Sequence, residues 1–184
     1  MNKILACAIL SLGILTAARA QEAAVSTNVA DYADLGTMNM GMSYALARHW
    51  TVDAVVKYNP FSYRMPDEAV VQRKQRLFGA GARFWPWHVY SGWWLSGRAQ
   101  WQEFSQSLLR ESIATEGDRV GAALAAGYSY MLSKHFNLEV GAGVWAGYTA
   151  YTRYACPRCG RIIGRGREGF ILPSDVILAL SYIF

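Results

Sequence analysis

From residue 23 onward, apolar residues alternate with polar or small residues at a period of two. Between Val120 and Tyr130, for example, bulkier residues occupy one set of alternate positions, and Gly, Ala and Ser occupy the other. This period is typical of β-strands, whose successive side chains point to opposite faces of a sheet. The pattern predicts eight strands, at residues 23–30, 38–46, 50–58, 77–85, 93–102, 120–130, 136–150 and 176–184.

The connections between these strands differ in length. Short turns at residues 47–49 and 132–135 contrast with long connections at residues 59–73, 103–118 and 152–174. All five prolines fall between predicted strands, where the missing N–H breaks no ladder. An even strand number, with short turns at one rim and long loops at the other, is expected of a bacterial outer-membrane barrel.

The two faces of the predicted strands indicate which side meets lipid. One face carries bulky apolar residues, and the other carries Gly, Ala and Ser with isolated charges. A soluble barrel would instead fill its lumen with the bulky residues. Trp50 with Tyr58 and Trp93 with Trp101 are pairs on one face, separated by eight residues. Eight residues climb roughly 20 Å, close to the spacing of two aromatic girdles. We therefore expect an all-β fold, an eight-stranded antiparallel up-and-down transmembrane β-barrel.

Composition supports an exported membrane protein. The 184 residues are 53% hydrophobic and only 17% charged, which fits neither a disordered chain nor a nucleic-acid-binding arm. Residues 1–20 have the pattern of a secretory signal peptide: Lys3, an apolar stretch, and Ala18-Arg19-Ala20 as the cleavage site. We therefore predict a signal peptide at residues 1–20 and a barrel at residues 21–184, located in the bacterial outer membrane.

The carboxyl terminus has the most specific pattern. Phe184, Tyr182 and Leu180 share one face of the last predicted strand, and the chain ends on the aromatic residue. This face is similar to the terminal signal that the barrel assembly machinery reads.

The chain resembles a family of small bacterial outer-membrane β-barrels, domain of unknown function 3575. The resemblance covers the mature chain and rests on three segments: Val25-Ser26-Thr27-Asn28-Val29, Ala82-Arg83-Phe84-Trp85 and Cys156-Pro157-Arg158-Cys159-Gly160. It implies an outer-membrane location and surface or fimbrial proteins as partners, with a role in surface assembly. It implies no biochemical activity.

Cys156 and Cys159 fall in the long connection at residues 152–174. Two thiols at this spacing are compatible with a short disulfide in an exported protein, and this is the interpretation we favour. Free thiols, half of a zinc site completed by a partner, and a redox dithiol are the alternatives.

The same connection is basic. It contains five arginines against Glu168: Arg153, Arg158, Arg161, Arg165 and Arg167. Guanidinium groups match phosphate geometry, so a loop of this kind can pair with lipopolysaccharide. A merely solvated loop is the alternative. The formal G-x-G-x-x-G at residues 164–169 lacks the strand and helix that a dinucleotide site requires.

Four charged residues on the small-residue face are expected to meet in the lumen: Asp53, Glu139, Arg83 and Arg98. Buried charges must be paired, so we expect ion pairs and a filled interior. Trp85, Trp94 and Trp145 also point inward on this pattern, which argues against a small-solute pore.

We expect a non-enzymatic envelope protein without cofactors that contacts outer-membrane lipid, lipopolysaccharide and surface proteins through its extracellular loops. The rival hypotheses are a lipopolysaccharide-modifying enzyme and a narrow channel. His49, His88 and His135 all fall at short turns, away from the outer leaflet in which such an enzyme would work. No nucleic-acid partner is expected.

Overall fold

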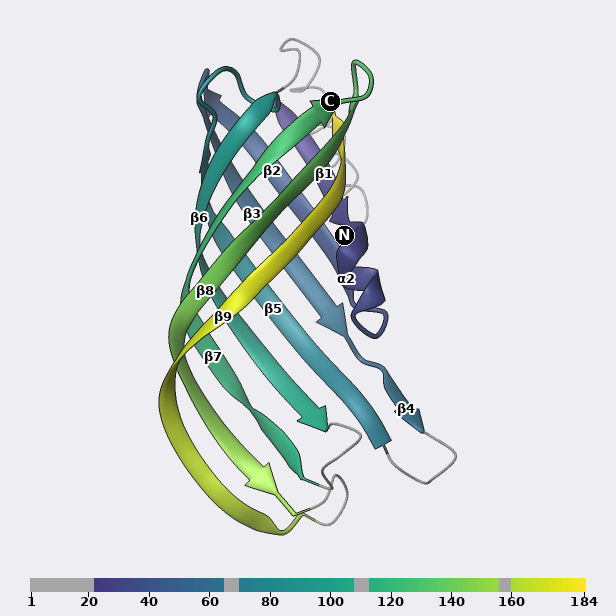
Figure 1. Cartoon of the computed structure of the whole chain (residues 1–184), viewed down its shortest axis with the longest axis vertical. Helices are drawn as coiled ribbons and strands as arrows, with labels where there is room; N and C mark the ends of the chain where they lie inside the picture. The colour runs from purple at the N-terminus through teal and green to yellow at the C-terminus, as the bar shows by residue number, and fades with distance from the viewer. Residues whose placement is uncertain (1–21, 65–69, 108–112, 156–159) are drawn as a thin grey trace, which may run out of the picture.

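The computed structural model describes residues 22–64, 70–107, 113–155 and 160–184. Most of them belong to strands (Figure 1). The elements in chain order are β1 (Ala23–Asn28), α2 (Val29–Ala33), β2 (Met38–Ala47), β3 (Trp50–Asn59), β4 (Ser62–Arg64), β5 (Val70–Phe84), β6 (Gly92–Ser107), β7 (Ala114–Met131), β8 (Phe136–Tyr154) and β9 (Ile162–Ile183).

The strands form one antiparallel sheet that closes on itself. Consecutive strands pair with each other, except that β3 pairs with β5 and not with β4, and β1 pairs with both β2 and β9. β3 and the short β4 both pair with β5, so together they occupy one position in the wall. The result is a closed eight-stranded barrel, which confirms the predicted fold class.

The two ends of the barrel differ. The turns at residues 48–49, 85–91 and 132–135 and the carboxyl terminus lie at one end, which we call the short-turn end. At the opposite, long-strand end, β7, β8 and β9 extend furthest (Figure 1). The barrel is therefore tall on the side of β7–β9 and short on the side of β1 and β2.

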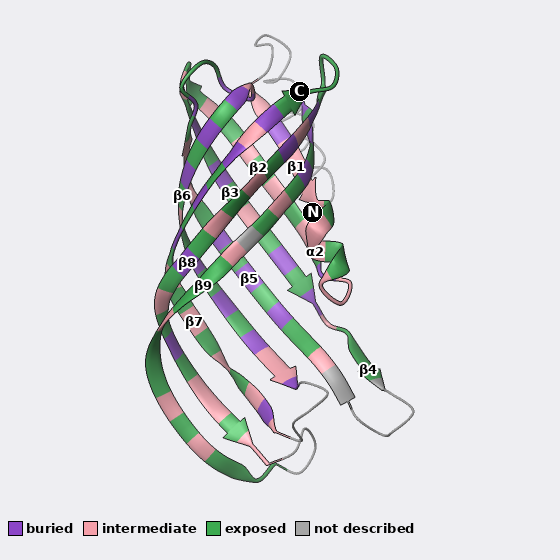
Figure 2. Ribbon diagram, in the orientation of Figure 1, coloured by how far each residue is buried: buried purple, intermediate pink, exposed green. Residues whose placement is uncertain are grey.

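The two faces of the strands follow the predicted period of two (Figure 2). The girdle residues Trp50, Tyr58, Trp93 and Trp101 are between 39% and 58% exposed on the outer face. The inner face carries small and polar residues together with Trp85, Trp94 and Trp145, which are at most 4% exposed. Large apolar side chains thus cover the outside of the barrel, as a lipid-facing wall requires. No helix among the described residues is long and apolar enough to cross a membrane.

The prediction of long loops at residues 59–73, 103–118 and 152–174 is wrong for most of these residues, because they belong to strands. β5 begins at Val70, β6 continues to Ser107, β7 begins at Ala114, and β9 already begins at Ile162. Strand pairing uses backbone groups, so a strand continues where its outer side chains become charged. In these outer parts of the strands, apolar and polar residues no longer alternate clearly. The sequence pattern therefore does not predict that the strands continue.

Pro173 also lies inside a strand rather than between strands. The register of β8 and β9 shifts between the pairs Ala142–Val176 and Val144–Pro173, which is a β-bulge. A bulge tolerates a residue without an N–H because the ladder is already interrupted.

The short helix α2 replaces the end of the first predicted strand. Asn28 caps the helix, with its side chain accepting a hydrogen bond from the Ala30 N–H. Because β1 ends at Asn28, the chain leaves the wall early and α2 contacts both β2 and β9.

Candidate functional site

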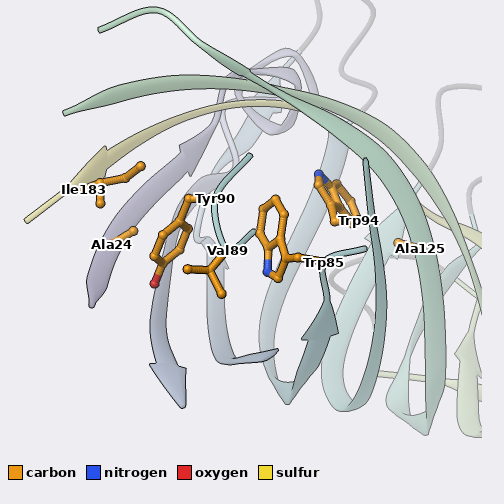
Figure 3. Close-up of a cluster of buried hydrophobic side chains, with 7 residues drawn as sticks. All are labelled: Ala24, Trp85, Val89, Tyr90, Trp94, Ala125 and Ile183. Carbon is orange, nitrogen blue, oxygen red and sulfur yellow. The ribbon is translucent and has the colours of Figure 1, made fainter. Parts of the chain in front are cut away.

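The short-turn end is sealed by a plug that we define as Trp85, Val89, Tyr90 and Trp94. Figure 3 shows these side chains clustered inside the barrel with Ala24, Ala125 and Ile183. Trp85 is 0% exposed. Three of the four plug residues come from the turn between β5 and β6, which therefore folds into the lumen instead of lying on the rim.

Hydrogen bonds fix this turn to the wall. The Trp85 N–H donates to the His49 carbonyl over 2.9 Å, and the Trp85 indole donates to Thr51 Oγ1 over 3.1 Å. Ser129 Oγ donates to the Tyr90 carbonyl, while the Tyr90 hydroxyl donates to the Glu22 carbonyl. Tyr90 has a φ of 64°, a conformation that costs energy for a residue with a side chain. These bonds hold that conformation, and burial raises the pKa of the Tyr90 hydroxyl, so it stays neutral.

Gly92 allows the plug turn to return to the wall. Its φ is +75°, and a Cβ at this position would lie 2.5 Å from the Trp87 ring. Only glycine meets both conditions without strain.

A chamber with charged walls lies inside the barrel, between the plug and the long-strand end. Arg83 Nη1 donates to Glu139 Oε2 over 2.7 Å, and Ser181 Oγ donates to the other carboxylate oxygen over 2.8 Å. The Arg83 guanidinium also stacks over the Trp94 ring, 4.3 Å from its centre. Asp53 and Arg98 line the same cavity of about 70 Å³. The four charged residues predicted to meet in the lumen therefore do lie together, with Arg83 and Glu139 in direct contact.

The helix α2 and the turn that follows it, up to Thr37, close this chamber from the long-strand end. We call these residues the lid. Asp31 of α2 points inward to Lys57, with 2.9 Å between carboxylate and ammonium. The turn that follows is held by Asn59 and Gln75, whose amides donate to Thr37 Oγ1 over 3.0 and 3.1 Å. The lid was not predicted, because a five-residue helix is too short to show a helical period; the capping residue Asn28 is the only local signal.

Beyond the lid, the long-strand end contains a cavity of about 930 Å³, which we call the mouth. Its walls come from β3 and from the outer parts of β5–β9, including Phe104, Gly117, Tyr151 and Gly166. A Cβ on Gly166 would meet the Tyr151 hydroxyl at 2.7 Å, so Gly166 faces the mouth. Its neighbours Arg165 and Arg167 consequently point to the outer surface.

The basic residues predicted in one loop are distributed differently in the structure. Arg165 and Arg167 belong to β9 and Arg153 belongs to β8, where its guanidinium stacks on Tyr151. Arg161 lies in the turn before β9 and is exposed. The prediction of a basic loop is therefore wrong for most of its members: they are positions on paired strands. Arg158, Cys156 and Cys159 lie outside the described residues.

The three histidines lie at the short-turn end. Each ring nitrogen Nδ1 bonds to a main-chain carbonyl: His49 to Trp85, His88 to Val89 and His135 to Ile183. Among the described residues, no group of three His, Cys, Asp or Glu side chains could hold a metal ion.

The sequence profile of the family described as "Protein of unknown function (DUF3575)" matches residues 5–184. The chain belongs to this family. The crystal structure of the outer membrane protein OprG from Pseudomonas aeruginosa is similar, with a TM-score of 0.49 and 14% identity over 90% of this chain and 94% of that one. No curated protein matches the chain in sequence. The fold of this family member follows from its own strand pairing.

Proposed function

We propose that this protein is a non-enzymatic, non-conducting barrel of the bacterial outer membrane that binds a partner at the cell surface through its long-strand end. The observation that carries the proposal is the difference between the two ends. Trp85, Tyr90 and Trp94 fill the lumen at the short-turn end. The lid closes the lumen a second time, between the chamber and the mouth. The mouth, at the opposite end, offers a cavity of about 930 Å³, which is large enough for a ligand of ordinary size.

The outer surface supports the membrane location. Its exposed apolar side chains and two aromatic girdles match the belt of a transmembrane barrel. Short turns face the periplasm in such barrels, which directs the mouth to the cell exterior. A signal peptide at residues 1–20 would supply the export route, and the outward-facing Phe184, Tyr182 and Leu180 would supply the assembly signal.

Charged residues continue on the outer wall beyond the girdles. Arg76 and Glu103 form a loose pair at 3.7 Å, and Arg165 and Arg167 are exposed on β9. Anionic groups outside the membrane, namely lipopolysaccharide phosphates or the carboxylates of a partner, would reach Arg165 and Arg167 here, and guanidinium groups bind both. Surface proteins, fimbrial proteins among them, are the partners we propose for the mouth.

The proposal is tested by photo-cross-linking from the two ends of the barrel in intact cells. The probe is attached to a single cysteine, introduced as Thr152→Cys at the long-strand end or as Lys134→Cys at the short-turn end, after Cys156→Ser and Cys159→Ser. We expect a cross-linked surface component from Thr152→Cys and not from Lys134→Cys, because only the mouth faces outward.

Two results would contradict the proposal. Stepwise currents from the purified protein in planar bilayers would show that the plug and the lid do not seal the lumen. Altered lipid A after incubation with the protein would show an enzyme.

A further inference from the structure

The outer part of β9 has one edge without a strand partner. β8 pairs with β9 along almost its whole length, whereas β1 reaches only from Ala179 to Ile183. The Asn28 side chain then replaces the missing strand for one step: its Nδ2 donates to the Val176 carbonyl, and its Oδ1 accepts from the Leu178 N–H. Among the described strands, none pairs with this side of residues 162–172, which we call the free edge.

The free edge exists because the wall is incomplete at the long-strand end. There the barrel is a curved sheet of β4 to β9, with β4 and β9 as its two borders. β1 and β2 lie between these borders closer to the short-turn end, and they end before they reach the long-strand end (Figure 1). Closed barrels have no edges, and an exposed edge is a ready template for another strand.

Charge indicates which strand would fit. Arg161, Arg165 and Arg167 are exposed in or next to the free edge and form no ion pair with another described residue. Glu168 is the only acidic residue within residues 160–172. Two copies of this edge would bring their arginines together, and like charges on neighbouring strands repel. An acidic strand would neutralise them.

The arginines next to the free edge are spaced for contact with a paired strand. Arg165 and Arg167 lie two residues apart and share one face, so acidic side chains at alternate positions of a paired strand would reach both.

We propose that residues 162–172 bind an extended acidic segment of another protein, which pairs with β9 as an additional strand. The inference rests on the proposed function, since it names the partner's chemistry at the same end of the barrel. Main-chain hydrogen bonds supply the affinity, and the arginines select acidic sequences.

The test measures binding of a synthetic ten-residue peptide of alternating threonine and glutamate to the mature protein in detergent, by fluorescence anisotropy. Two further peptides carry N-methyl groups on the odd or on the even residues. In a strand, alternate N–H groups point to opposite edges. One methylated peptide should therefore bind at least tenfold more weakly, while the other binds like the parent peptide. Equal affinities of both for the barrel would overturn strand pairing.

A second arm tests the arginines. Arg165→Glu with Arg167→Glu should weaken binding at least tenfold and should favour a peptide of alternating threonine and lysine. Arg76→Glu, an exposed reversal on β5, is the matched control and should change little. An unchanged affinity in the double variant would overturn the assignment. If the unmodified protein binds no peptide, the strand inference fails, whereas a cross-link from Thr152→Cys would still support the proposed function.

Discussion

Replacement of Trp85 by alanine is expected to lower the free energy of unfolding by about 3 to 5 kcal/mol. The Trp85 side chain is completely buried, and its ring packs against Tyr90 with 5.8 Å between ring centres. Its removal leaves a void in a lumen whose wall is a closed hydrogen-bonded sheet, so neighbouring groups can relax little. The substitution also removes the indole hydrogen bond to Thr51.

The measurement is equilibrium unfolding in urea, followed by circular dichroism of the barrel folded in lipid vesicles. Trp87→Ala is the matched control because Trp87 lies in the same turn and is 61% exposed. We expect its effect to be less than half that of Trp85→Ala. Equal losses of stability would mean that the turn does not act as a plug.

Arg83→Ala should have an effect of comparable size, about 3 to 5 kcal/mol, because it leaves a buried carboxylate without its cation. The Arg83 and Glu139 side chains are only 17% and 6% exposed, and the hydrogen bond from Ser181 to the carboxylate would remain. Adding Glu139→Gln to Arg83→Ala should recover part of the loss, since it removes the unpaired charge.

A second arginine–glutamate pair in the same barrel serves as the control. Arg76 and Glu103 lie 3.7 Å apart with side chains that are 61% and 53% exposed. Arg76→Ala should therefore cost about 1 kcal/mol or less. If Arg76→Ala and Arg83→Ala shift the urea midpoint equally, the Arg83–Glu139 pair does not stabilise the lumen.

The period of two was sufficient to predict the faces of the strands. Because side chains alternate strictly, it placed Asp53, Arg83, Arg98 and Glu139 on one face, and the structure brings these residues to one chamber. The direct pairing of Arg83 with Glu139 could not be predicted, since it depends on how far the strands are staggered around the barrel. A single sequence does not contain that stagger.

The sequence did not predict the outer part of β9 or the whole plug, because the structure of these segments depends on contacts with distant residues. The outer part of β9 has the sequence Gly164-Arg165-Gly166-Arg167, which is indistinguishable from a loop without knowledge of its pairing with β8. The plug has a similar explanation. Trp85 and Trp94 were predicted to point inward, but nothing local indicates that Val89 and Tyr90 follow them into the lumen.

The central claim is that the sealed end faces the periplasm and the mouth faces the exterior. It is tested most directly by labelling intact cells with a membrane-impermeant maleimide, in the background Cys156→Ser with Cys159→Ser. Gly164→Cys marks the long-strand end, and Lys134→Cys marks the turn between β7 and β8. The account predicts that Gly164→Cys is labelled on intact cells and that Lys134→Cys is labelled only after the outer membrane is broken. Labelling of Lys134→Cys on intact cells, with Gly164→Cys protected, would contradict it.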